Sequence, residues 1–376
     1  MCANIKSSKK AEICIIGAGI HGICTGYFLA KKGYKVIIID KDYISQRASG
    51  VNPGTLSVQN KHPDSLLFLA KKSIDVWAYF GNMDEEIEYR RCGGFRIAET
   101  EDEAEKLKED MKKQRELGLK IEYLEGKDLA KAAPYLSNKL FAANYCDIDG
   151  YASADIAVKR IAKFAQREGV EFILHEEAYM IKTKSNTVVI ETRSGVYEAE
   201  KLLIACGVWS PKVCSWLGVN IPINIDINHV MVSAPEKNIV KHVITHVKGY
   251  LTVKQPDIGT VLIGGGWQGE GNLSTDEKLL SISSIVGNIH CAYRAIPLIS
   301  EFLINRIWLE FNANSKDKLP LLGKLPGYEN IYINAFTSGG FTLGPYLGSL
   351  AADLMVEGKT SKDLSYLDPS RFVDYQ

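Results

Sequence analysis

The pattern of apolar and polar positions near the N-terminus predicts a strand, a helix and a second strand in close succession. Residues 13–16 and Val36–Ile39 are uninterrupted apolar runs, which is typical of parallel strands buried on both faces. Residues 20–32 between them have a helical pattern and end at Gly33, a residue that favours helix C-termini.

Farther along, the pattern alternates between helices and strands before it becomes rich in strands. A small-residue loop, 45–54, follows the second strand and can pass close to a flat cofactor. The other predicted helices are 63–80, 101–117, 155–169, 274–304 and 341–357. The other predicted strands are 141–149, 170–174, 187–192, 196–200, 201–205 and 331–334, with a strand pair in 89–99 and a strand-rich stretch at 221–266.

Three glycines follow the first strand in the pattern G-x-G-x-x-G. Gly17 allows a tight turn, Gly19 lets the backbone approach a pyrophosphate, and Gly22 lets the helix pack close to the strand. The free N–H groups of the helix then point at the phosphates. Asp40, at the end of the second strand, can accept hydrogen bonds from a ribose hydroxyl pair and disfavours a 2′-phosphate. This segment predicts a bound dinucleotide.

Residues 264–269, GGGWQG, match the same glycine pattern after an apolar strand. Polar residues follow in place of a helix, and no second strand with a terminal acid comes after them. We therefore expect one dinucleotide site and no built-in NAD(P)H pocket beside it.

A second glycine-rich turn lies near the C-terminus, where residues 337–340 join a strand to a helix with Pro345 in its first turn. A helix N-terminus stabilises negative charge. Placed against the pyrimidine end of an isoalloxazine ring, it would stabilise an anionic reduced flavin. An ordinary strand-to-helix turn fits these residues equally well.

Composition and charge exclude several classes of protein. The chain has 376 residues with 46% hydrophobic content, which suggests two domains or one domain with a long insertion. Its 45 basic and 45 acidic residues cancel, so no overall field favours nucleic acid or an anionic membrane. No apolar run is long enough to span a bilayer or to act as a signal segment, so we expect a cytoplasmic protein.

The eight cysteines are scattered without a C-x-x-C pair, which favours reduced thiols over disulfides and gives no iron–sulfur or zinc pattern. His242 and His246 have a spacing that could serve a metal, but no third ligand accompanies them. We predict no metal ligands.

Together these elements predict an α/β fold, α+β overall. A Rossmann-like dinucleotide-binding domain is assembled from three chain segments, 1–88, 150–218 and 308–376. A mostly antiparallel β domain, formed by 89–149 and 219–307, is interleaved with it and provides the substrate or interface region.

The motifs resemble the D-amino-acid oxidase superfamily of FAD-dependent oxidoreductases, and within it the glycine oxidase, sarcosine oxidase and dye-linked dehydrogenase group. The resemblance covers nearly the whole chain. It implies non-covalent FAD and oxidation of the C–N bond of an amino acid or N-substituted glycine, with hydride passing from the α-carbon to flavin N5 and hydrolysis of the imine. Its carriers are IIGAGIHG with Asp40, RASGVNPGTLSVQN, YRRCGGFRIAET, IACGVWSPKV, VLIGGG and LPLLGKLPGYENIYINAFTSGGFTLGP.

The chain is especially similar to the FAD-bearing β subunits of heteromeric sarcosine oxidase, of dye-linked proline, D-hydroxyproline and opine dehydrogenases, and of the hydrogen cyanide synthase complex. This implies a catalytic subunit with partner subunits, and an FMN or iron–sulfur centre on or with a partner. A second hypothesis is a non-catalytic FAD-bearing subunit that relays electrons or acts as a scaffold. A third is an NAD-linked enzyme with the same fold.

Three positions depart from the pattern of these relatives. Asn312 lies about where many have an arginine for the substrate carboxylate, so Lys254 or Arg91 would have to bind it, or the substrate is not a simple amino acid. Ala154 lies where sarcosine oxidase β has a flavin-linked histidine, so no covalent second flavin is expected. Thr342 replaces a lysine thought to help oxygen react, which favours a dehydrogenase over an oxidase.

The candidate catalytic residues are Tyr250, Lys254 and Thr342. Tyr250 and Lys254 are predicted on one face of a strand, from which they could reach the front of the flavin; a surface or structural pair is an equally good interpretation. The residues expected to contact the cofactor are Gly17, Gly19, Ile20, His21, Gly22, Asp40, Lys41, Ser49, Gly50, Asn52, Gly54, Leu56, Ala178, Cys206, Gly207, Trp209, Gly339, Gly340, Phe341, Thr342 and Leu343.

Overall fold

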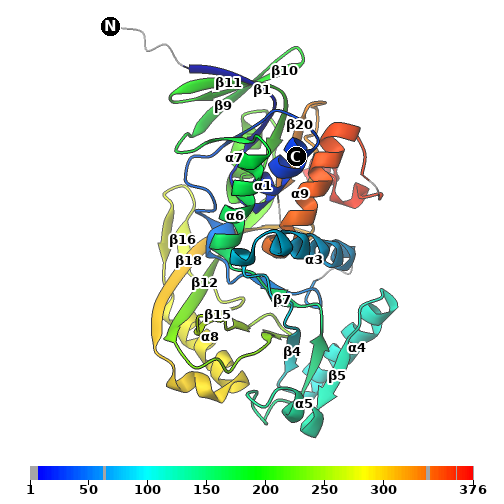
Figure 1. Ribbon diagram of the computed structural model, residues 1–376, viewed down its shortest axis with the longest axis vertical. Coiled ribbons are helices and arrows are strands. Elements are labelled where there is room, and N and C mark those ends of the chain that lie inside the picture. Colours follow the sequence, from blue (N-terminus) through cyan, green and yellow to red (C-terminus); the bar gives the residue numbers. More distant parts are fainter. Residues whose placement is uncertain (1–6, 62–64, 336–338, 361, 376) are drawn as a thin grey trace.

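A computed structural model describes residues 7–61, 65–335, 339–360 and 362–375 and contains two large sheets (Figure 1). The first sheet is mostly parallel at its centre, where β1 pairs with β2 and β11. Its strands, in spatial order, are β19 (Leu321–Lys324), β20 (Ile331–Ala335), β11 (Gly195–Ile204), β1 (Ser7–Ile16), β2 (Val36–Ile39) and β8 (Glu171–Ile173), with β10 (Thr187–Thr192) and β9 (Ala178–Lys184) added beside β11.

The second sheet is antiparallel except where β13 pairs with β4. Its order is β18 (Ile304–Ser315), β12 (Ile223–Pro235), β15 (Thr260–Gly264), β14 (Thr252–Lys254), β13 (Val243–His246), β4 (Gly94–Ala98), β6 (Ala142–Cys146) and β5 (Glu122–Glu125). Two short ribbons pair β3 (Thr55–Leu56) with β7 (Gly150–Tyr151), and β16 (Glu270–Asn272) with β17 (Glu277–Leu279).

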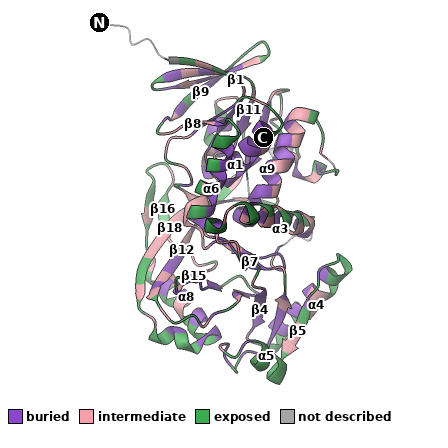
Figure 2. Ribbon diagram, viewed as in Figure 1, coloured by how far each residue is buried: buried purple, intermediate pink, exposed green. Residues whose placement is uncertain are grey.

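Helices cover both sheets. The α-helices are α1 (Ile20–Lys31), α2 (Ala48–Val51), α3 (Ser65–Met83), α4 (Glu101–Glu116), α5 (Gly126–Ala132), α6 (Ala154–Arg167), α7 (Ser210–Ser215), α8 (Ile282–Ala295) and α9 (Gly340–Glu357). Short 3-10 helices span Glu85–Ile87, Gly207–Trp209, Pro297–Glu301, Ser365–Leu367 and Pro369–Tyr375. Figure 2 shows buried strands at the centre, while the outer faces of α4 and α8 are exposed.

The central strands are buried on both faces, as their apolar runs predict. Ile13 and Ile15 of β1 pack with α1, α3, α6 and α9 in one core, whereas Cys14 and Ile16 belong to a second core on the opposite face of the sheet. A third core lies between the second sheet and α8. The predicted α/β fold is confirmed, and the chain enters the first sheet in three separate stretches.

Three predicted elements are wrong. Residues 89–99 contain one strand, β4, and not a strand pair, because both edges of β4 are occupied by β6 and β13. The two strands predicted at 196–200 and 201–205 are one strand, β11 (Gly195–Ile204), because the polar start of β1 also extends to pair with it, from Ser7 opposite Gly195. The predicted helix 274–304 is restricted to α8, and the exposed residues before it form the β16–β17 hairpin.

The predicted domain boundary at 307/308 falls inside β18, which pairs along its length with β12 in the second sheet. The division into domains stays a prediction. Within the described residues, no helix is both long and apolar enough to cross a bilayer. The cysteines there are free thiols, and most of them are buried.

Helices α1 and α9 cross at very short range because α9 carries two glycines on the face that meets α1. A Cβ at Gly344 would lie 2.7 Å from Ile20 Cγ1, and one at Gly348 would lie 2.5 Å from Cys24 Cβ and 2.9 Å from the Thr25 backbone nitrogen. All three distances are too short for a real Cβ atom. The close crossing brings the N-terminal ends of both helices to one side of the molecule.

We expect Gly348→Ala to lower the free energy of unfolding by about 1–3 kcal/mol, because the methyl group forces α1 and α9 apart. Urea unfolding measures the change. Ser349→Ala, on the same helix, is the matched control and should change stability by about 0.5 kcal/mol or less. Equal stability of Gly348→Ala and the unmodified protein would contradict the close-packing argument.

Candidate functional site

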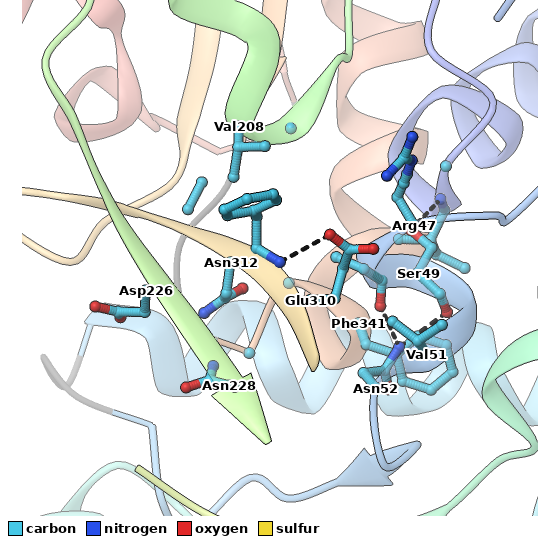
Figure 3. A pocket seen from close by; sticks show the side chains of 18 of the residues that line it. Arg47, Ser49, Val51, Asn52, Val208, Asp226, Asn228, Glu310, Asn312 and Phe341 are labelled. Atoms are coloured by element: carbon cyan, nitrogen blue, oxygen red, sulfur yellow. Dashed lines mark hydrogen bonds between the residues drawn. The ribbon is translucent and has the colours of Figure 1, made fainter. Parts of the chain in front are cut away.

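Residues from both sheets line a cleft of about 970 Å³. The turn between β1 and α1 lines one part of it, and the turn at the start of α9 lines another. Side chains of β12 and β18 form a further wall, seen from close by in Figure 3. Pockets of this size accommodate a large organic cofactor.

The glycine turn after β1 has the geometry that its sequence predicts. Gly17 adopts a φ of +117°, and a Cβ there would lie 2.3 Å from the Ala205 carbonyl oxygen. A Cβ at Gly22 would lie 2.0 Å from the Gly17 carbonyl oxygen, so only glycine lets α1 start this close to the strand. Gly19 caps α1 without a side chain, and Ser49 Oγ accepts a hydrogen bond from the Ile20 amide at 3.0 Å. The start of α1 therefore faces the cleft as a site for an anionic group.

Asp40 lies at the end of β2, where it lines the cleft. Its Oδ2 accepts a hydrogen bond from the Ala18 amide at 2.6 Å, and its Oδ1 accepts one from the Asp42 amide at 2.8 Å. Burial raises the pKa of Asp40, and these two hydrogen bonds oppose that effect. A carboxylate has about four acceptor positions, so both oxygens can still accept hydrogen bonds from a ribose.

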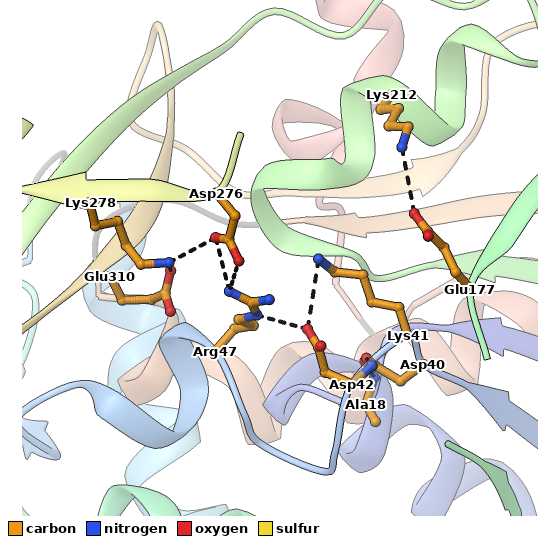
Figure 4. Close-up of polar contacts among 10 residues, drawn as sticks. All are labelled: Ala18, Asp40, Lys41, Asp42, Arg47, Glu177, Lys212, Asp276, Lys278 and Glu310. Carbon is orange, nitrogen blue, oxygen red and sulfur yellow. Dashed lines mark hydrogen bonds and ion pairs between the residues drawn. The ribbon is translucent and has the colours of Figure 1, made fainter. Parts of the chain in front are cut away.

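A network of charged residues borders the cleft near Asp40 (Figure 4). Arg47 contacts Asp42 and Asp276, each at 2.8 Å. Lys278 contacts the same Asp276 at 2.8 Å and Glu310 at 3.4 Å. The network ties the loop after β2 to the β16–β17 hairpin and to β18.

The indole ring of Trp209 lies beside this network. Lys41 Nζ is 4.2 Å from the centre of the ring, and the Arg47 guanidinium carbon is 5.3 Å from it. The two cations hold the indole by cation–π contact. A flat aromatic surface thus lines the cleft close to Asp40.

Hydrogen bonds of His21, on α1, connect the first glycine turn to the second. The His21 Nδ1 atom is 2.9 Å from Asn334 Oδ1, at the end of β20, and the ring also forms a hydrogen bond with the Gly340 backbone. Burial lowers the pKa of His21, which keeps the ring neutral. Gly339 precedes α9 in a left-handed conformation with φ +89°. Residues 337 and 338 of the predicted turn lie outside the described residues.

Thr342 lines the cleft in the first turn of α9 and is buried. Its hydroxyl donates to the Thr55 carbonyl oxygen at 3.2 Å, and Trp77 Nε1 donates to the Thr342 carbonyl oxygen at 3.2 Å. The Thr342 hydroxyl hydrogen is therefore already engaged within the protein.

Most residues expected to contact a cofactor do line this cleft. A smaller group does not line it. The cleft-lining group is Gly17, Gly19, Ile20, His21, Asp40, Lys41, Ser49, Asn52, Ala178, Cys206, Gly207, Trp209, Gly339, Gly340, Phe341 and Thr342. The residues that do not line it are Gly22, Gly50, Gly54, Leu56 and Leu343.

The expectation that Tyr250 and Lys254 share one face of a strand is wrong. β14 begins at Thr252, so Tyr250 precedes it and lies 47% exposed, stacked on His246 with ring centres 5.8 Å apart. Lys254 is buried, and its Nζ donates to the Ala152 carbonyl oxygen at 3.0 Å and lies over the Tyr151 ring. Burial lowers the pKa of Lys254 to about 7. Neither Tyr250 nor Lys254 is among the residues that line the cleft.

Arg91, the other cation considered for a substrate carboxylate, is half exposed and contacts Asp147 at 3.4 Å. Two buried cations that the sequence did not single out line the cleft instead, Lys61 and Arg96. Arg96 contacts Asp110 at 2.8 Å. Lys61 comes directly after the motif RASGVNPGTLSVQN, residues 47–60, and this position is the one signal that the sequence offers. Hydropathy alone does not show that a lysine is buried.

Asn312 lies on β18 directly opposite Asp226 of β12, and both line the cleft with Asn228. This wall is polar, but at position 312 it has an asparagine and not the arginine that binds the substrate carboxylate in many relatives.

Among the described residues, no group of three or more His, Cys, Asp or Glu side chains could hold a metal. His242 is instead 2.8 Å from the Tyr135 hydroxyl.

The GGGWQG segment does not form a second dinucleotide turn. Gly264 ends β15, and the residues after Gln268 form the β16–β17 hairpin and not a helix. Gly264–Gly266 nevertheless line the cleft.

Comparison with known proteins gives a family for this architecture. A family model described as FAD dependent oxidoreductase matches residues 12–354. Glycine oxidase of Geobacillus kaustophilus (strain HTA426) is 26% identical over 377 residues, covering 97% of this chain and 98% of that protein. Sarcosine oxidase subunit beta of Rhodobacter capsulatus is 25% identical over 368 residues, covering 95% and 87%.

The fold is similar to that of solved structures as well. L-proline dehydrogenase from P. horikoshii superposes with a TM-score of 0.91 at 22% identity, covering 98% of this chain and 100% of that one. At this level of identity the likeness concerns the fold.

We expect the stability of Lys254→Met to exceed that of the unmodified protein at pH 7, and the difference to shrink as the pH rises toward 10. The pKa of Lys254 is about 7 in the folded protein against 10.5 for a free lysine. Between these values the unfolded chain holds the proton more tightly. The unfolding free energy of the unmodified protein therefore rises with pH, by at most about 1.4 kcal/mol per pH unit.

Urea unfolding of both proteins at several pH values from 7 to 10 measures this effect. Lys127→Met, which removes an exposed lysine, is the control and should follow the unmodified protein at every pH. Parallel curves for Lys254→Met and the unmodified protein would contradict the expected burial of this charge.

Proposed function

The chain belongs to the family of FAD-dependent oxidoreductases, and on that basis we propose that it oxidises the C–N bond of an amino acid or secondary amine as the catalytic subunit of a heteromeric dehydrogenase. The observation that carries the proposal is one cleft lined by both glycine turns and closed by the polar strands β12 and β18. FAD is the cofactor of this family.

The residues of the cleft fit an extended FAD. We assign the ADP half to the turn Gly17–Gly22, with Asp40 accepting from the ribose and Trp209 beside the adenine. We assign the flavin half to the segment from Ser49 to Thr55 and to the turn at Gly339. Two separated helix N-termini, at Ile20 and Gly340, support this assignment because each stabilises negative charge.

When bound, FAD supplies the acceptor for the hydride that leaves the carbon next to the amine nitrogen. The chain's own residues contribute orientation and a site from which water is excluded. With the neutral His21 and the engaged hydroxyl of Thr342, we assign no general base among them, and hydride transfer needs none if the amine arrives uncharged. Tyr250 and Lys254 do not line the cleft, and the proposal gives them no catalytic role.

The proposal of a heteromeric complex is supported by the name of one relative, sarcosine oxidase subunit beta. The partner would carry the electrons onward from the reduced cofactor, with an FMN or iron–sulfur centre of its own. The free thiols of the described residues fit a reducing compartment, so we propose a cytoplasmic location.

A non-catalytic FAD-bearing subunit is the second candidate. Asn312 favours it, because a neutral amide lies on the cleft wall where many relatives that oxidise amino acids have an arginine. In this case the chain would relay electrons or support the active site of a partner.

We expect the purified, FAD-loaded protein to lose its yellow colour anaerobically with one or more of proline, hydroxyproline, sarcosine, glycine and opines. Flavin absorbance in a stopped-flow or sealed cuvette measures this. If none of them reduces the flavin, alone or with co-purifying partner chains, while photoreduced protein still passes electrons to a dye, the relay subunit is the better description.

We also expect the reduced protein to pass electrons to a dye at least about tenfold faster than to oxygen. The reason is that the neutral Thr342 stands where the resemblance implies a lysine that helps oxygen react. Reoxidation rates in air-saturated buffer and in anaerobic dye are compared on the same sample. Reoxidation by oxygen at the rate of the dye would make the protein an oxidase.

A further inference from the structure

Oxidation of an amino acid requires that its carboxylate be held in the cleft, and the following inference rests on the proposed function. Several cleft-lining cations of the described part of the chain already contact carboxylates. Arg47 contacts Asp42 and Asp276, Arg96 contacts Asp110, Lys212 contacts Glu177 and Lys248 contacts Glu103. Each of these is therefore partly neutralised before a substrate enters.

Lys61 differs from these cations in its surroundings. It lines the cleft with only 7% of its surface exposed. Its Nζ donates to the side-chain oxygen of Asn60 at 3.1 Å, a neutral partner. The carboxylate whose charge acts on it, Asp149, is engaged by Ser57 Oγ at 2.8 Å and by the Val58 amide at 2.6 Å.

A buried ammonium group without a close anion is costly, because the protein replaces little of its hydration. The cost appears as a pKa of Lys61 lowered to about 8 by burial. An anion that arrived in the cleft beside Nζ would remove this cost and form a charge-assisted hydrogen bond. An ammonium held in this way fits a binding function better than a structural one.

Lys61 also lies at the second glycine turn. A Cβ at Gly339 would come within 2.7 Å of Lys61 Nζ and 3.2 Å of its Cε. The lysine thus reaches the point where α9 begins, at the end of the cleft to which the flavin half is assigned. A group bound there meets both the ammonium and the start of α9, which favours negative charge.

We propose that Lys61 binds the carboxylate of the amino-acid substrate, with Asn60 orienting its ammonium group. Lys61 thereby supplies the positive charge for the carboxylate that the neutral Asn312 cannot supply. The substrate class is then an amino acid or N-substituted amino acid with a free carboxylate, rather than a simple amine or an ester.

The test uses the FAD-loaded protein and two planar probes that cannot be oxidised like the substrate, pyrrole-2-carboxylate and its neutral analogue pyrrole-2-carboxamide. Isothermal calorimetry gives both dissociation constants. In Lys61→Met we expect affinity for the carboxylate to fall about 10- to 100-fold and affinity for the carboxamide to change less than about threefold. Lys61→Arg should keep most of the carboxylate affinity, and Lys127→Met all of it.

Three outcomes would overturn the proposal. The first is carboxylate binding by Lys61→Met as tight as by the unmodified protein. The second is an equal loss of affinity for the carboxylate and for the carboxamide, which would mean that the substitution damages the cleft. The third is an unmodified protein that does not bind the carboxylate at millimolar concentration.

A different role for Lys61, holding the pyrimidine edge of the flavin, makes a separable prediction. It would shift the midpoint potential of the ligand-free flavin in Lys61→Met while leaving carboxylate affinity unchanged, and that result also overturns the proposal. Should Lys61→Met not fold, as judged by its thermal midpoint, Lys61→Gln and Lys61→Arg make the same comparison.

Failure of this inference and failure of the proposed function are distinguishable. Reduction of the flavin by amino acids in the unmodified protein tests the function. If the flavin is reduced and Lys61→Met binds the carboxylate normally, the function stands and the role of Lys61 does not. If no amine reduces the flavin but the carboxylate binds through Lys61, the cleft recognises a carboxylate without oxidising it.

Discussion

The close crossing of α1 and α9 is the constraint on which the site depends. Helix α1 starts at the turn after β1, and α9 starts at the turn after β20. Because Gly344 and Gly348 let the two helices touch at Ile20 and Cys24, their N-terminal ends open on one cleft. His21 adds a direct connection, since its ring bonds to Asn334 and to the backbone of Gly340. Two electropositive helix ends are thereby held at a fixed separation, as a long cofactor with charge at two places requires.

The cleft also concentrates buried charge, which distinguishes it from the apolar cores around it. Lys61 and Arg96 are buried, and Asp40 is partly buried. Asp40 and Arg96 have partners within the chain, whereas Lys61 has the amide of Asn60. Buried charges lower the free energy of unfolding of the ligand-free protein, and a bound ligand can offset this by pairing with them. The cleft is thus expected to be the least stable part of an otherwise well-packed fold.

Sequence reasoning recovered what depends on short segments. The turn at Gly17 and the acid at Asp40 follow from a local strand, helix and strand pattern, and the structure has both at the predicted positions. The predicted strand bounds were wrong where pairing with strands distant in the sequence sets them. β11 is one strand because β1 extends beside it, and Tyr250 lies outside β14, which begins only at Thr252. Lys61 was missed for the same reason. Lys61 lies close to Gly339 and within the influence of the charge of Asp149, both distant in the sequence, and no local pattern shows this.

The order in which the first sheet takes up its strands has a consequence for synthesis. β1 and β2 leave the ribosome first, β8 to β11 follow, and β19, β20 and α9 are among the last elements. Until α9 emerges, the face of α1 that contains Ile20 and Cys24 has no cover, and the cleft lacks one of its two helix ends. Long-range pairing of this kind forms slowly and leaves apolar surface open to aggregation. Cofactor loading must therefore be a late event, completed only after α9 has emerged.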